Sequence, residues 1–340
     1  MEPAKAERSP SGLASADGLG SPHRFATAWA LEQSTLGLAA GALWALLLAI
    51  ATRPAALLLA RPTLIVAATL AVAGCLAHAV LPAASLWRPS APGGGRILVV
   101  AWRRRVVAML GLSLALSIAV AALVAPVYAE GDKPPTRFDD LPLPAMAVAA
   151  ALSTLWLGLA ALRAGGDGGG ALRVAVSANP IATLAQPTAQ ALLGGMALIL
   201  LVGLVIGQIT AELTYELAAG VAMAALWASG SAGRVLRGMH RLRVAEEETG
   251  LRRPRLSAAL RLAMTATLLG VLLPAVVIVG ELARARVAGV IVAAFALVAS
   301  GHPLRYGISL ALWYSRDLRA PFGGSWATSA NAATDGDAGS

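Results

Sequence analysis

Six polar residues lie within or beside the apolar stretches of this chain and could carry proton chemistry: Glu32, Gln33, His78, His302, Arg305 and Tyr306. Such groups are costly in hydrocarbon, so each one marks a candidate functional site. His302, Arg305 and Tyr306 follow at i, i+3 and i+4, which puts them on one face of a helix. Imidazole and carboxyl groups exchange protons near neutral pH. The set therefore predicts a site that binds a quinone head group and exchanges its protons.

The same residues also fit two other interpretations. In a structural one, Arg305 pairs with Glu32, and His78 reaches the membrane interface. In a haem-binding one, His78 and His302 are axial ligands, because the other two histidines fall outside the apolar stretches. Haem remains the weaker expectation, since haem-bearing bundles more often supply several intramembrane histidines.

The sequence predicts no metal site and no iron–sulfur cluster held by this chain. No Cys, His and carboxylate residues cluster at ligand spacing. Cys75 is the only cysteine, and such clusters need several thiolates.

Eight apolar stretches must position these residues. They are 33–52, 63–82, 106–127, 143–163, 186–208, 212–229, 258–280 and 287–315. Each approaches or exceeds the ~20 residues that a membrane-spanning helix needs, and helices satisfy every backbone polar group internally. The chain is 57% hydrophobic and only 13% charged. We predict an all-α polytopic membrane protein with a bundle of eight transmembrane helices over 25–316, a disordered arm over 1–24 and a disordered tail over 317–340.

The net charge of +9 is explained by membrane topology rather than by nucleic acid. Lys and Arg concentrate on the side of the N-terminus, so the positive-inside rule predicts cytoplasmic termini. Arginine outnumbers lysine and alanine is abundant, which suggests a GC-rich bacterial genome. We therefore expect a multi-pass protein of the bacterial cytoplasmic (inner) membrane. The basic segments hold candidate docking residues for a partner protein: Arg103, Arg104, Arg105, Arg234, Arg237 and Arg241. The segment 230–257 is either a solvated loop or a helix that extends below the membrane with an arginine face.

Four motifs resemble those of a known family. They are LEQSTLGLAAGALWALL at 31–47, LAHAVLPAASLW at 76–87, VYAEGDKPPTRFDDLPLP at 127–144 and SGHPLRYGISL at 300–310. Together with span count and length, they resemble the membrane anchor of the DMSO-reductase type and its relative, the NrfD or polysulfide-reductase anchor. One departure is the start of the third stretch, VVAWRRRVVAML, which lacks the acidic residue often found there.

The resemblance implies a non-catalytic subunit without its own redox centre. Such an anchor binds menaquinol or ubiquinol beside an iron–sulfur (ferredoxin-like) subunit, which passes electrons to a molybdopterin catalytic subunit. By position, His78 would be the quinone-proximal imidazole and Arg305 the arginine of the closing helix. Glu32 and Gln33 would stand at the polar positions of the first helix. The alternatives are a small-solute transporter and a haem b-bearing cytochrome subunit.

Overall fold

The computed structural model describes residues 22–80, 94–128, 132–133, 142–166, 180–247 and 254–314. All secondary structure in these ranges is helical: α1 (Pro22–Thr52), η2 (Pro54–Leu59), α2 (Ala60–Val80), α3 (Gly94–Val124), α4 (Leu143–Gly166), α6 (Pro180–Ile206), α7 (Ala211–Glu247), α8 (Pro254–Thr267), η4 (Leu268–Leu272), α9 (Leu273–Ala283) and α10 (Val287–Tyr314). The predicted arm and tail lie outside these ranges, apart from the first residues of α1.

Within the described ranges, six helical segments are long and apolar enough to cross a membrane: Trp29–Thr52, Pro54–Ala77, Val106–Val124, Ala185–Ile206, Pro254–Ala283 and Val287–Ala311. The chain is therefore a helical, multi-pass membrane protein, as predicted. Two of the eight predicted stretches do not reach this standard. The apolar part of α4 is a shorter helix, and α7 begins with acidic residues and ends in a polar half.

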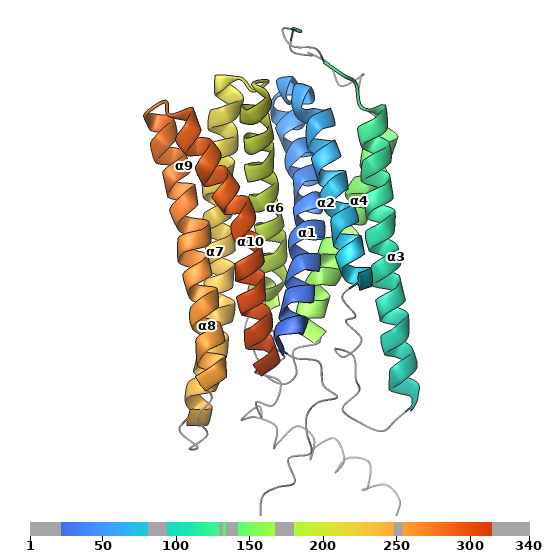
Figure 1. The fold of residues 1–340 in the computed structure, drawn as a ribbon, viewed down its shortest axis with the longest axis vertical. Coiled ribbons are helices and arrows are strands. Elements are labelled where there is room, and N and C mark those ends of the chain that lie inside the picture. The colour runs from blue at the N-terminus through green and yellow to red at the C-terminus, as the bar shows by residue number, and fades with distance from the viewer. Residues whose placement is uncertain are drawn as a thin grey trace, which may run out of the picture.

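The helices stand side by side in one bundle (Figure 1). α1 is central and contacts α2, α4, α6 and α10. α3 packs on α2 and α4 at one flank, and α8 and α9 pack on α7 and α10 at the other. Because α10 lies between α1 and α8, residues from the two ends of the chain meet in the middle of the bundle.

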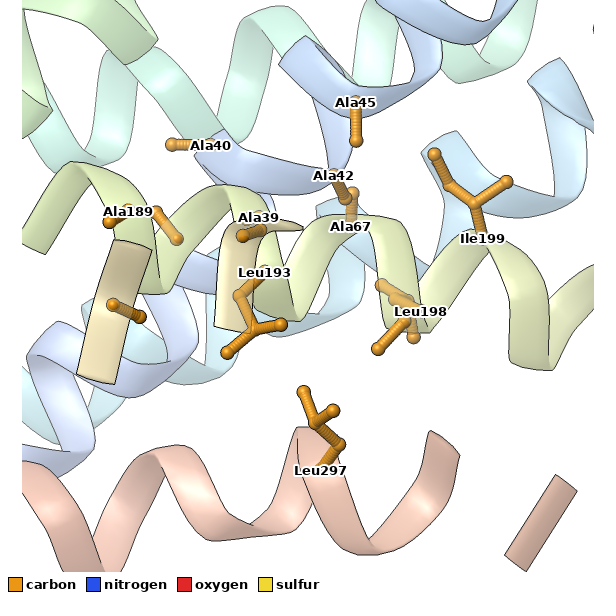
Figure 2. Packing of buried hydrophobic residues seen from close by; sticks show 14 of the residues in the cluster. Ala39, Ala40, Ala42, Ala45, Ala67, Ala189, Leu193, Leu198, Ile199 and Leu297 are labelled. Carbon is orange, nitrogen blue, oxygen red and sulfur yellow. The ribbon is translucent and has the colours of Figure 1, made fainter. Parts of the chain in front are cut away.

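Small residues hold the centre together. A Cβ placed on Gly41 of α1 would overlap the carbonyl oxygen of Ala191 in α6. Ala39 and Ala42 of α1 are also fully buried, and Figure 2 shows Ala39 beside Leu193 of α6. Since lipid offers no hydrophobic drive between helices, such close packing supplies the association.

Two helices run further than the sequence predicts. α3 begins at Gly94, so the arginines 103–105, expected in a loop, belong to a helix. α7 has 37 residues, which at 1.5 Å per residue is about 55 Å and exceeds the ~30 Å of hydrocarbon. Its second half carries Arg234, Arg237 and Arg241, all exposed. Of the two interpretations of 230–257, the described residues show the helical one.

Candidate functional site

The buried arginine of α10 is the centre of the site. Arg305 is 5% exposed, and its Nη1 donates a hydrogen bond to the backbone carbonyl of Gln33 in α1. Gly37, one turn later in α1, leaves room for the guanidinium: a Cβ there would lie 3.0 Å from both Nη1 and Nη2. Glycine at this position therefore lets a charged group of α10 reach the backbone of the central helix.

A cavity of about 20 Å³ lies beside this arginine, between α1, α6 and α10. Ser34 and Gln190 contribute polar groups to its wall. Gln190 Nε2 donates to the carbonyl of Gly301 over 3.4 Å and its Oε1 accepts from Gln186 Nε2 over 2.9 Å. A polar space of this size holds about one water molecule. A quinone ring does not fit inside it.

An aromatic series continues the site along α10. The rings of His302 and Tyr306 are stacked with centroids 6.4 Å apart, and the Tyr306 hydroxyl lies 2.7 Å from Nδ1 of His23 in α1. Nδ1 of His302 is buried without a hydrogen-bond partner among the described residues. The same holds for Nε2 of Gln33. Buried polar atoms normally find a partner, so both leave capacity for a ligand or a water.

We refer to Gln33, Gln190, His302, Arg305 and Tyr306 as the arginine cluster. The structure thus brings together four of the six predicted site residues and adds Gln190.

The other two predicted site residues are Glu32, in α1, and His78, in α2. Glu32 is buried on α1, and its charge acts on the Cys75 thiol of α2. His78 follows Cys75 by three residues, in the last turn of α2, but its side chain is outside the described residues. The side chains of the predicted docking arginines 103–105 are likewise not described.

The helices beside the cluster are irregular. The five residues of η4 form a π-helical turn between α8 and α9, and α10 contains Pro303. A Cβ on Gly270 in this turn would lie 2.7 Å from Cβ of Ser300, one turn before the arginine. π-helical turns often occur at functional sites. This irregularity therefore marks the same place independently of the charged residues.

The opposite end of the bundle carries exposed ion pairs. Arg53 follows α1 and pairs with Glu212 at 3.0 Å and with Glu216 at 2.7 Å. The hydrogen bond and the charge of Glu216, with the charge of Glu212, raise the pKa of the Arg53 guanidinium. Arg284 contacts Glu281 at 3.3 Å. The contacts of Arg53 join the end of α1 to the start of α7, and the contact of Arg284 lies at the end of α9 alone.

Two glutamines and one histidine escape the sequence-based prediction. Gln186 and Gln190 stand at i and i+4 in an apolar stretch, a spacing that already indicates one polar face. His23 precedes the first apolar stretch, which is why the prediction left it out of the site, and it bonds to Tyr306.

Comparisons with protein-family models, with curated proteins and with solved structures each find no match for this chain. Among the described residues, no three His, Cys, Asp or Glu side chains gather in a way that could hold a metal ion.

Proposed function

We propose that this chain is the quinone-binding membrane anchor subunit of a multisubunit oxidoreductase. The site is the arginine cluster, and the quinone head group contacts it at His302 and Tyr306, whose side chains are half-buried. Arg305 and the one-water cavity lie behind these two residues. Quinol oxidation releases two protons and two electrons. In this proposal the electrons pass to an iron–sulfur subunit, which feeds a molybdopterin catalytic subunit.

The buried nitrogen of His302 is the observation that carries the proposal. An imidazole nitrogen without a partner can hydrogen-bond a quinone oxygen or accept a proton from the quinol hydroxyl. It lies beside the Tyr306 phenol, a further hydrogen-bonding group for that oxygen, and one turn from the buried positive charge of Arg305. In an apolar setting such groups fix ligand orientation.

The cost of Arg305 supports the same conclusion. Placing a guanidinium in the interior of a membrane bundle costs several kcal/mol before any interaction offsets it. Its hydrogen bond to one backbone carbonyl offsets only part of this. An apolar side chain of similar size would pack at lower cost. A residue kept at such cost is more readily explained by function than by stability.

The proposal includes the membrane topology. We propose that all eight helical segments span the membrane, α4 and α7 included, and that both termini are cytoplasmic in a bacterial inner membrane. The support is the basic surface at the end of the bundle where α1 begins and α7 ends. Arg234, Arg237 and Arg241 are exposed there.

The same surface is the proposed docking site for the iron–sulfur subunit. The three arginines lie on the part of α7 that exceeds the hydrocarbon thickness, so a peripheral protein can reach them. Charge complementarity to an acidic face steers such an encounter.

Purification of the full chain from its native membrane in mild detergent tests the proposal. We expect bound quinone in a solvent extract, and iron–sulfur and molybdenum proteins among the co-purifying partners. His302→Phe should lower the bound quinone about tenfold, because it removes the hydrogen bond and keeps the ring. The matched control is His240→Phe at an exposed histidine of α7, which should leave the quinone content unchanged. A wild-type chain without quinone and without partners would contradict the anchor function and favour a transporter.

A further inference from the structure

An open groove of about 490 Å³ lies between α1, α8 and α10. Its polar residues are His23, Arg255 and Tyr314, and its apolar wall includes Ala259, Leu262 and Leu310. The proposed function does not use this groove as its site, although His23 links it to Tyr306. The volume falls in the range of small-molecule sites.

The groove lies at the depth of the lipid head groups. The continuous segment Pro254–Ala283 has 30 residues, or about 45 Å, against ~30 Å of hydrocarbon. Arg255 is in its first turn, and His23 precedes the first apolar segment, which begins at Trp29. Further toward the membrane centre, α8 exposes Leu262 and Met264, and η4 exposes Leu268. The polar residues thus sit at the interface, and the apolar wall continues into a lipid-facing surface.

The charge at the mouth of the groove is positive, and the described residues supply no counterion for it. Arg255 is exposed and forms no ion pair with a described residue, and none of the described lining residues is acidic. The positive end of the helix dipole lies at the same place, since α8 begins at Pro254. A cation at a helix N-terminus is unfavourable unless an anion is present.

We infer that the groove binds an anionic phospholipid from the surrounding leaflet. The phosphate pairs with Arg255 and with the helix N-terminus, while Tyr314 and His23 offer hydrogen bonds to the head group. The first acyl methylenes lie along Leu262 and Leu310. Basic pockets between membrane helices on the cytoplasmic side commonly bind such head groups. A neutral quinone would leave the charge of Arg255 uncompensated, which favours the phospholipid. The inference is independent of the proposed function.

Lipid titration of the purified full chain tests the inference. Phosphatidylglycerol, added to the detergent-solubilised protein, should raise the Tm followed by tryptophan fluorescence, because a ligand that binds the folded state stabilises it. Phosphatidylcholine with the same acyl chains should raise it less. Arg255→Gln should weaken phosphatidylglycerol binding about tenfold.

Arg261 provides the matched control. It lies on the same helix and is exposed, but it does not line the groove, so Arg261→Gln should keep the response to phosphatidylglycerol. A second variant, Leu262→Trp, fills the groove without changing the charge and should also abolish the response. Equal losses in the Arg255 and Arg261 variants, or equal responses to both lipids, would overturn the inference. Displacement of phosphatidylglycerol by decylubiquinone would assign the groove to the quinone instead.

Discussion

The two ends of this bundle use arginine in opposite ways. At one end, Arg53 is 45% exposed and pairs with two glutamates across helix ends. In the other half, Arg305 is 5% exposed and reaches a backbone carbonyl beside a one-water cavity. An exposed ion pair gains little because water screens it and the side chains lose freedom. A buried guanidinium has already lost its hydration. Placing an arginine therefore costs little free energy at one end of the bundle and several kcal/mol in the other half.

This difference indicates where function resides. Much of the packing between α1 and its neighbours is made by alanine and glycine, which need no charged partner, so the guanidinium of Arg305 stands out there. The exposed ion pairs, by contrast, sit where the chain turns and where polar residues are ordinary. Changing Arg305 should therefore affect ligand binding more than stability, and changing Arg53 should affect both only slightly.

The largest effect is expected from Arg305→Met. The side chain keeps a similar length without the charge, so the fold should be retained, with a stability that is unchanged or raised by up to about 4 kcal/mol. Quinone binding should fall about ten- to a hundredfold, because the positive charge next to His302 and Tyr306 is lost. Thermal unfolding in detergent checks the predicted stability, and the quinone content of the purified protein checks the predicted loss of binding. Loss of the folded protein with normal quinone content in the remainder would make Arg305 a structural residue.

The sequence predicts the helices of this molecule better than it predicts their contacts. The depth of a residue in the membrane follows from counting residues along its apolar stretch. For this reason the sequence correctly predicts that Gln33 and Arg305 lie at the same depth, where they contact each other. The direction of each side chain around its helix depends on which helices become neighbours. For that reason Gln190 and His23 escaped prediction, and so did the position of Gly37 against the guanidinium of Arg305. Helix ends are also poorly predicted, because α3 and α7 continue through arginine-rich turns that resemble loops.

A smaller effect is expected from Gly37→Ala, which moves the guanidinium without removing it. The added Cβ would lie 3.0 Å from Nη1 and Nη2 of Arg305, so the side chain must shift by a few tenths of an ångström. We expect quinone affinity to fall by a few fold, less than in Arg305→Met. Gly158→Ala in α4 is the control, because a Cβ there meets nothing within 4 Å, and a helical alanine should stabilise by about 0.5–1 kcal/mol. If both variants bind quinone equally well, the exact position of the guanidinium does not matter for the ligand.

The smallest effect is expected from Arg53→Gln at the opposite end. The ion pairs with Glu212 and Glu216 are exposed, so the Tm in detergent should shift little and quinone content should not change. Because the glutamates raise the pKa of Arg53, its contribution is present at every pH below the ordinary arginine pKa and is lost only as the pH rises above it. Titration of Arg53 should therefore cause no change in the Tm difference between wild type and variant when it is measured from pH 7 to pH 9. A large loss of stability would mean that the end of the bundle depends on this contact. The contrast between an inexpensive and a costly arginine would then no longer separate structure from function.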